Sequence, residues 1–333
     1  MTTSMVDKYA LFPVKDKESF VFRQKQENIL WFAEELKFTD DKLDYDRCNP
    51  NMKRVIDLIM AFFSVGDGAI SENLLERFLL ESETYEERSM FITQLYVEQQ
   101  HAITYGMSTQ TFIPNTVELE KLLQEVDNSE CVKKKVEFMQ KWCRSDKPRH
   151  LRLIAFACAE GIFFCTLFAA VFWFRSRGIF NNFISANEMI SRDETLHRDY
   201  GIMLFSRAAA KLGVSLNDPE TLEVIEEALE IEDLFIDQLL SEPLEDLNAA
   251  DMKTYARVIT NNMLTTMGYN QKYQVKNPFT WLNDINLEQK GNFYEVTVAS
   301  YKKRSMTETL DWESKLGWKE ASSVLEDPSN VDF

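Results

Sequence analysis

Two short motifs of the same form place a glutamate and a histidine three residues apart. The chain has only three histidines, and two of them end a Glu-x-x-His motif, at Glu98/His101 and Glu194/His197. Residues three apart share one face of a helix, so each motif can offer a carboxylate and an imidazole to one metal ion. A single motif of this kind arises easily by chance. Two copies, each in the middle of a predicted helix, indicate a shared site.

Each motif is preceded by an isolated acid in an earlier apolar stretch. Asp67 stands 31 residues before Glu98, and Glu160 stands 34 residues before Glu194. One acid followed by Glu-x-x-His, used twice, is typical of helical bundles that bind two iron or two manganese ions through carboxylates. Four carboxylates balance two divalent ions, and an oxygen-rich set favours iron or manganese over structural zinc. The alternative is two unrelated buried ion pairs.

Two polar side chains lie close to these candidate ligands in the sequence. Tyr105 follows His101 by four residues and therefore lies on the same helical face. Asp193 directly precedes Glu194 and could accept the outer N–H of a ligand histidine. The alternative for Asp193 is a solvated acid on the helix surface.

Three apolar residues are candidates for a dry pocket around Tyr105. Phe164 and Phe168 follow Glu160 by four and eight residues, on its face, and Ile190 stands four residues before the second motif's glutamate. The alternative is ordinary core packing. The two interpretations differ only in whether these three side chains lie next to Tyr105.

The elements that must position these residues are predicted to be long helices. Ten Gly and eight Pro in 333 residues are few, which favours helices over many short strands. The spacing predicts an irregular segment over 1–25 and one all-α domain from residue 26. Helices are predicted over 26–37, 51 to about 80, 88–111, 116–144, 153–174 and 181–212, with two or more between about 217 and 275. Gly66 and Gly68, on either side of Asp67, are predicted to mark a close backbone approach or a kink.

Composition excludes several other classes of protein. A net charge of −17 argues against broad contact with nucleic acid. Five Cys without a C-x-x-C motif indicate no disulfide framework, and the first twenty residues do not read as a signal peptide. Residues 153–174 are long enough to span a bilayer but contain Glu160, so we predict a central helix of a soluble bundle and no membrane.

At this point the motifs resemble a known family. AFFSVGDGAISENLLERF around Asp67, VEQQHAITY ending at Tyr105, AEGIFF around Glu160 and ANEMISRDETLH ending at His197 are similar to the small, radical-generating subunit of class I ribonucleotide reductase. WFAEE at Trp31 and KNPFTWLNDINLEQKGNFYE after residue 275 extend the resemblance to roughly residues 10–305. It is nearest to the eukaryotic and large-DNA-virus branch.

The resemblance implies a ferritin-like helical bundle with extra helices over 26–300 and a flexible C-terminal tail over 301–333. It also implies two iron ions in a di-iron-oxo centre, with manganese possible on ligand grounds. One metal would be held by Asp67, Glu98 and His101, and the other by Glu160, Glu194 and His197.

Further roles follow from the same resemblance. Tyr105 would carry a stable tyrosyl radical, and Trp31 and Asp193 would belong to the path of the electron and proton. Tyr301 occupies the place of the family's relay tyrosine, although about thirty residues follow it here, more than the family usually has. The C-terminus, Asp332-Phe333, resembles the tail that docks on the large catalytic subunit.

The function implied is that of a cytoplasmic, homodimeric small subunit of ribonucleoside-diphosphate reductase. Its metal centre would react with dioxygen to form the radical, and the large subunit would use this radical to reduce ribonucleotides to deoxyribonucleotides. The alternatives are a related di-metal oxidase or monooxygenase, a ferritin-type iron storage protein and a catalytically silent partner subunit. An oxidase or monooxygenase would require a substrate cavity near Phe164, and a storage protein would be a shorter chain that assembles into a cage. A silent subunit is expected to have lost metal ligands, whereas all six candidates are present here.

Overall fold

A computed structural model describes residues 13–143 and 146–282, together with residues 5, 9 and 10. The side chains of Val65, Asp67 and Ala69 lie outside this description. The elements in chain order are α2 (Lys17–Asn28), η1 (Ala33–Glu35), η2 (Phe38–Asp40), α3 (Lys42–Arg47), α4 (Pro50–Asn73), η3 (Leu74–Phe78), α5 (Leu79–Glu81), α6 (Tyr85–Phe112), α7 (Thr116–Asn128), α8 (Glu130–Trp142), α9 (Arg149–Cys158), η4 (Ala159–Phe163), α10 (Phe164–Arg175), α11 (Asn181–Leu212), α12 (Pro219–Leu239) and α13 (Ala249–Thr266). Within the described ranges, strand pairing is limited to one isolated bridge, so the all-α prediction is confirmed.

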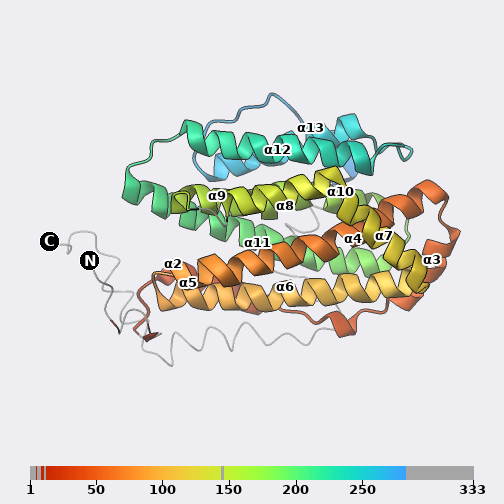
Figure 1. Ribbon diagram of the computed structural model, residues 1–333, viewed down its shortest axis with the longest axis horizontal. Coiled ribbons are helices and arrows are strands. Elements are labelled where there is room, and N and C mark those ends of the chain that lie inside the picture. The colour runs from red at the N-terminus through yellow and green to blue at the C-terminus, as the bar shows by residue number, and fades with distance from the viewer. Residues whose placement is uncertain (1–4, 6–8, 11–12, 144–145, 283–333) are drawn as a thin grey trace. The chain divides into compact units, whose positions relative to one another are not determined.

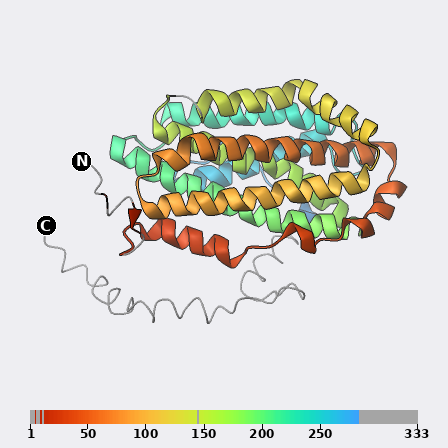
Figure 2. The same cartoon turned by 60° about the horizontal axis from the view of Figure 1, so that its bottom comes forward.

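The long helices form a bundle around a central rod. Helices α4 and α6 pack side by side, and α2 packs along α6 (Figure 1). The rod, made of α9, η4 and α10, packs against α11, while α12 contacts α8, α9 and α13 (Figure 2). Site residues predicted on α6, the rod and α11 therefore come from neighbouring helices.

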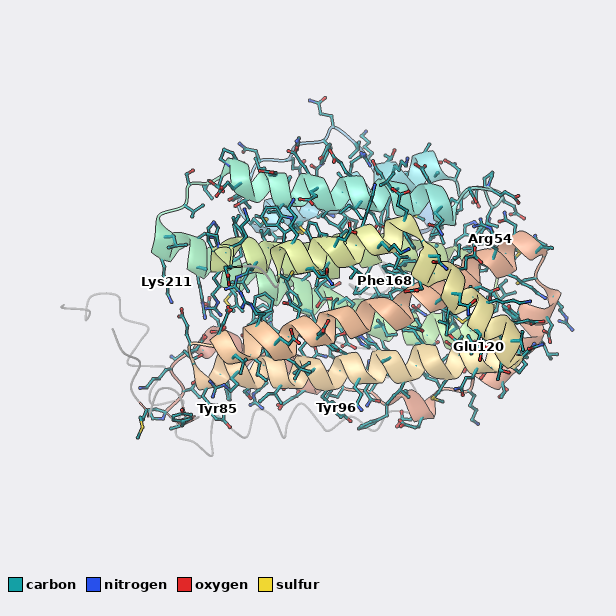
Figure 3. The ribbon with its side chains drawn as sticks, viewed as in Figure 1. Arg54, Tyr85, Tyr96, Glu120, Phe168 and Lys211 are labelled. Carbon is teal, nitrogen blue, oxygen red and sulfur yellow. The ribbon has the colours of Figure 1, made fainter. Side chains whose placement is uncertain are left out.

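The apolar stretch predicted as a central helix occupies that position. The continuous helical segment Arg149–Arg175 is apolar enough to cross a membrane, but 94% of its most apolar window is buried within the bundle. A helix that is hydrophobic all round is expected to be covered by others on every side. Figure 3 shows the same contrast for single residues, since Phe168 of the rod lies inside, whereas Tyr85 and Tyr96 lie along the outer edge of α6.

Two helix predictions were wrong near the N-terminus. Residues 17–25 lie in the segment predicted to be irregular but belong to α2, whose first turn is capped by Asp16 because its carboxylate accepts a hydrogen bond from the Ser19 amide. Most of the helix predicted over 26–37 is absent, since α2 ends at Asn28 and residues 29–37 contain only one 3₁₀ turn, at Ala33–Glu35. This places Trp31 in the connection after α2.

The helix predicted over 116–144 is two helices, α7 and α8. Ser129 separates them with a backbone conformation of φ −64° and ψ 126°, outside the helical region. Its hydroxyl accepts a hydrogen bond from the Val132 amide and so begins α8. A serine inside an amphipathic run is a weak sequence signal for a break, which explains the error.

Two π-helical segments interrupt the long helices, and the sequence pattern predicted neither. Segment η3 continues α4, and segment η4 stands between α9 and α10 and contains Glu160. Single π turns inside α-helices frequently occur at functional sites. The close neighbour of Gly66, the glycine before Asp67, is a ring rather than a backbone. A Cβ at this position would lie 3.2 Å from Phe164 Cε1, which favours glycine there.

The predicted tail over 301–333 lies outside the described residues.

Candidate metal centre

Three segments bring the repeated motifs into one buried cluster. Helix α6 supplies Glu98 and His101, η4 supplies Glu160, and α11 supplies Glu194 and His197. One ligand atom from each of Glu98, Glu160, Glu194 and His197 lies within 4.8 Å of all the others, and all four residues are buried. The sixth candidate, Asp67, belongs to α4, but its side chain lies outside the described residues.

Both histidines turn Nδ1 toward the carboxylates. His101 Nδ1 lies 2.9 Å from Glu194 Oε1 and 3.4 Å from Glu98 Oε2. His197 Nδ1 lies 3.0 Å from Glu98 Oε1 and 3.0 Å from Glu194 Oε2. Each histidine thus contacts the glutamate of the other motif as well as its own. The two motifs form one site, which contradicts the alternative of two unrelated ion pairs.

The carboxylates and imidazoles of the cluster shift each other's pKa values. Burial lowers the pKa of His101, but the surrounding carboxylates, led by Glu194, raise that pKa well above its usual value. Burial acts on His197 in the same way, and Glu98 together with Glu194 raises the pKa of His197 to about 9. Burial raises the pKa of Glu98, but His197 and His101 together lower it to about 2. In the metal-free protein, imidazolium protons therefore supply the positive charge that buried carboxylates need.

The donor set fits divalent metal ions. The ligand atoms are carboxylate oxygens and imidazole nitrogens, without a thiolate, which suits iron or manganese. Glu98 Oε2 and Glu194 Oε1, which face His101 Nδ1, are buried without a hydrogen bond of ordinary geometry in the described part of the chain. Because buried polar atoms are nearly always paired, such carboxylate oxygens turned toward one another are consistent with a site built around an ion.

A series of hydrogen bonds leads from His101 toward the N-terminal segment. Asp193 Oδ2 lies 3.1 Å from His101 Nε2 and accepts a hydrogen bond of 2.8 Å from Trp31 Nε1. The other carboxylate oxygen, Oδ1, accepts a 2.8 Å bond from Gln26 Nε2 of α2. Asp193 is almost fully buried, which contradicts the alternative of a solvated surface acid. The structure therefore brings the predicted residues Trp31 and Asp193 together beside a candidate ligand.

Gln94 also contacts the cluster, and the sequence reasoning missed it. Its Nε2 donates to Glu160 Oε1 at 2.9 Å and lies 3.3 Å from Glu98 Oε1. It therefore joins the carboxylate of η4 to that of α6. Its position four residues before Glu98, on the same helical face, is a signal that could have identified it.

Tyr105 is fully buried and is contacted on several sides. Phe63 of α4 stacks on it with ring centroids 4.4 Å apart and an angle of 5° between the rings. The Tyr105 hydroxyl donates a 2.8 Å hydrogen bond to Asn187 Oδ1, and Asn187 Nδ2 donates to the Phe183 carbonyl at 2.8 Å. Sequence reasoning missed both contacts, although Phe63 stands four residues before Asp67 and Asn187 seven before Glu194.

The three residues predicted to line the pocket are all buried. Phe164 and Phe168 each pack against Phe63, with centroids 5.4 Å and 5.2 Å apart. Phe63 in turn stacks directly on Tyr105. Ile190 is fully buried on α11, between Asn187 and Glu194 in the sequence. The predicted relay residue Tyr301 lies outside the described residues.

A helical bundle whose neighbouring helices project two Glu-x-x-His motifs and a further glutamate into one buried cluster defines a ferritin-like di-metal carboxylate protein. Residues 8–278 match the family described as ribonucleotide reductase, small chain. The protein belongs to this family, as the resemblance of its motifs implied.

Known relatives agree with this assignment. The protein is 33% identical to the ribonucleoside-diphosphate reductase small subunit of Dictyostelium discoideum, over 89% of this sequence and 87% of the relative. It is 32% identical to the small chain of Variola virus, over 92% and 94%. Among solved structures, the ribonucleotide reductase Rnr4 homodimer of Saccharomyces cerevisiae has a TM-score of 0.76 and 26% identity, over 85% of this sequence and 90% of that one. The dimanganese(II)-NrdF of Streptococcus sanguinis, 16% identical, has the same fold with a TM-score of 0.74, over 81% and 96%.

Proposed function

We propose that this protein is the radical-generating small subunit of a ribonucleoside-diphosphate reductase and that Tyr105 carries the radical. The observation that carries the proposal is the position of Tyr105, fully buried and four residues, or about 6 Å, beyond His101 on α6. A storage protein has no need for a phenol enclosed in this way. Membership of the small-chain family favours this function over iron storage and over oxidation of an organic substrate.

The proposed metal centre uses the six predicted ligands. Asp67, Glu98 and His101 would hold one ion, and the second set, Glu160, Glu194 and His197, would hold the other. Two iron ions are our first choice, with manganese the alternative, since the ligands accept both. Bound in this site, the metal pair would supply the oxidising chemistry with dioxygen that the side chains lack.

Asp193 has two tasks in this proposal. By accepting the Nε2 proton of His101, it would fix the tautomer in which Nδ1, the nitrogen that faces the carboxylates, gives up its proton to bind a metal. The same carboxylate oxygen accepts the Trp31 indole N–H. An electron that leaves or enters through Trp31 can therefore move together with a proton along this hydrogen bond.

The surroundings of Tyr105 would protect a phenoxyl radical. Phe63 covers one face of the ring, and full burial excludes bulk water. The hydrogen bond to Asn187 orients the hydroxyl. An amide oxygen accepts a hydrogen bond but takes up no proton near neutral pH, so the proton lost on oxidation must pass to another acceptor.

A paramagnetic resonance experiment tests the radical assignment. Metal-free protein is loaded with ferrous iron and exposed to oxygen, and the spectrum is recorded for the wild type, Tyr105→Phe and Tyr200→Phe. Tyr200 is the matched control, because it is also fully buried and stands three residues after His197. A tyrosyl signal is expected in the wild type and in Tyr200→Phe only. An unchanged signal in Tyr105→Phe would refute the assignment.

We further propose that the subunit forms a homodimer, is soluble and cytoplasmic, and docks on the large catalytic subunit through residues 301–333. A peptide copying the last residues up to Phe333 is expected to compete for the large subunit, whereas a scrambled peptide is not. Tyr301→Phe is expected to abolish nucleotide reduction while leaving the Tyr105 radical intact. Full activity in that variant would show that Tyr301 is not the relay.

A further inference from the structure

A lysine is buried in the bundle beside the π turn that contains Glu160. Lys135 of α8 is 3% exposed, and its Nζ lies 2.6 Å from Oε2 of Glu232 on α12, which is 0% exposed. The Thr166 hydroxyl donates to the other oxygen of Glu232. Removing two charges from water is costly, and a well-packed apolar pair would often be as stable. Core stability alone therefore gives no reason for this pair.

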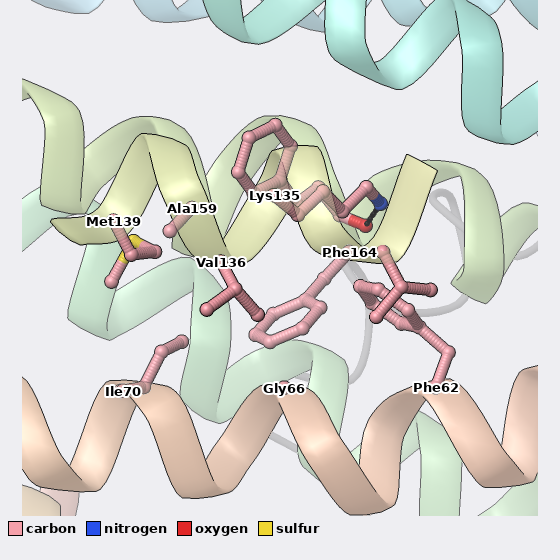
Figure 4. Close-up of a pocket in the computed structure, with 10 residues that line it drawn as sticks. Phe62, Gly66, Ile70, Lys135, Val136, Met139, Ala159 and Phe164 are labelled. Carbon is pink, nitrogen blue, oxygen red and sulfur yellow. Dashed lines mark hydrogen bonds between the residues drawn. The ribbon is translucent and has the colours of Figure 1, made fainter. Parts of the chain in front are cut away.

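Aromatic rings enclose the same ammonium group. Lys135 Nζ lies 3.9 Å from the ring centroid of Phe235, 4.1 Å from that of Phe62 and 4.9 Å from that of Phe163. These distances are within the range of cation–π attraction. The three rings come from α12, α4 and η4, so the lysine of α8 is fixed at a point where four segments meet. Figure 4 shows Lys135 among the residues that line one pocket together with Phe62 and Phe164.

Lys135 also bonds to the backbone of the π turn. Its Nζ donates to the carbonyl of Phe163, the last residue of η4, at 3.2 Å (Figure 4). The neighbouring carbonyl, that of Ile162, accepts a bond from Cys165 Sγ at 3.2 Å. A π turn departs from the regular hydrogen-bond ladder of an α-helix, so side-chain donors at its end help to keep it in place.

The π turn sets the direction of the Glu160 carboxylate. If the rod were a regular α-helix over the same residues, one flank of η4 would turn by about 100° relative to the other. Glu160 and the rings that follow it, such as Phe164, would then lose their present alignment. Gln94 holds the carboxylate itself at 2.9 Å, while Lys135 holds the backbone three residues further along the sequence.

We propose that Lys135 is a positioning residue for Glu160: its ammonium, fixed by Glu232, holds the π turn through the Phe163 carbonyl and so keeps the carboxylate aimed into the metal centre. The inference rests on the proposed function in one respect, that Glu160 is a metal ligand.

Binding of Mn(II) to the metal-free protein tests the inference without using activity. The double variant Lys135→Met/Glu232→Gln removes both charges together, so neither is left buried and unpaired, and Thr166 keeps an acceptor. We expect its affinity for Mn(II), measured from the resonance signal of the free ion, to fall by at least about tenfold, within the range known for outer contacts of metal ligands. Hydrogen exchange of the amides of residues 161–166 in the metal-free protein should be faster by a similar factor.

A matched control separates positioning from general stability. Arg152 and Glu81 form another pair with a buried arginine, on the α9 portion of the rod, with contacts of 2.9 Å and 2.6 Å. Arg152→Met/Glu81→Gln is expected to lower the unfolding temperature but to bind Mn(II) as the wild type does. Wild-type affinity in Lys135→Met/Glu232→Gln overturns the inference, and so does an equal loss in the control variant.

Two further variants keep the test decisive. Should Lys135→Met/Glu232→Gln not fold, Glu232→Gln alone weakens the anchor of Lys135 and is expected to reduce the affinity for Mn(II) by at least about threefold; wild-type affinity in it overturns the inference. Glu160→Ala reports on the proposed function separately. If Glu160→Ala binds Mn(II) as tightly as the wild type, the assignment of Glu160 as a ligand fails, and the inference fails with it. Loss in Glu160→Ala with no loss in the Lys135 and Glu232 variants overturns the inference alone.

Discussion

Phe63 is predicted to determine how long a radical on Tyr105 survives. Its ring is fully buried and lies parallel to the Tyr105 ring at 4.4 Å, and it also packs against Phe164 and Phe168. In Phe63→Leu the flat ring is replaced by a branched side chain that cannot stack on the phenol. The site stays apolar, so the change removes the shape of the contact rather than its hydrophobic character.

The size of the effect follows from the ring contacts. An aromatic pair contributes about 0.5–1.5 kcal/mol beyond the area that it buries, and near-isosteric core exchanges cost up to about 1.5 kcal/mol. We therefore expect Phe63→Leu to lower the free energy of unfolding by about 1–2 kcal/mol, which corresponds to roughly 2–6 °C in unfolding temperature for a protein of this size. A loss of about 1 kcal/mol from the packing that shields the radical corresponds to about fivefold faster decay.

The assay follows thermal unfolding of the metal-free protein and decay of the tyrosyl resonance signal after oxygen exposure. Phe78→Leu is the control, because Phe78 is also fully buried and pairs with two rings, Phe91 at 5.8 Å and Phe156 at 5.2 Å, neither of which is Tyr105. Both variants should lose similar stability, and only Phe63→Leu should shorten the radical lifetime. Equal lifetimes in the two variants would refute the reasoning that the stacked ring protects the radical.

Three further changes have definite expected outcomes. Asp193→Ala removes the acceptor of the His101 Nε2 proton and should weaken Mn(II) binding by about 10–100-fold in resonance titrations, whereas unchanged affinity would show that the tautomer needs no fixing. Burial raises the pKa of Asp57 to about 6 from 3.8, so the folded state is destabilised as pH rises from about 4 to 6. Asp57→Asn should therefore be more stable than the wild type above pH 6 by about 1–2 kcal/mol in denaturant titrations and equal to it below about pH 4, and a constant difference would contradict this cause. In Gly161→Ala the new Cβ would lie 2.7 Å from Arg198 Cδ, which should cost about 1–3 kcal/mol in thermal unfolding, and an unchanged unfolding temperature would show that this contact does not restrict the site.

The repeated ligand pattern could be predicted because it depends on local geometry alone. Helical periodicity places Glu98 and His101 on one face, and the same holds for Glu194 and His197, whatever the surrounding fold. Burial of four carboxylates and two imidazoles then requires a common partner, which joins the two motifs. The structure brings five of the six candidate ligands together. The side chain of the sixth, Asp67, lies outside the described residues.

The remaining features depend on contacts between distant segments. The π turn at Glu160 is held by a lysine 28 residues away in sequence, a bond that no local pattern contains. Phe63 meets Tyr105 only because α4 and α6 pack side by side at the right height. The break at Ser129 depends on one hydroxyl that accepts from a backbone amide, and a helix with a solvated serine would have the same sequence pattern.

The spacing of the functional residues on helix α11 limits how the sequence of this protein can change during evolution. Within eleven residues it carries Asn187, which accepts the hydrogen bond of the tyrosine hydroxyl, then Asp193, which contacts both Trp31 and His101, and then Glu194 and His197. An inserted or deleted residue in this interval would turn everything beyond it by about 100° and would misalign all these contacts at once. Substitutions on the outer face of α11 are therefore expected to be tolerated, whereas insertions and deletions between Asn187 and His197 are not. The contacts that α11 makes with the tyrosine hydroxyl, the metal centre and the electron path therefore all depend on one fixed length of this helix.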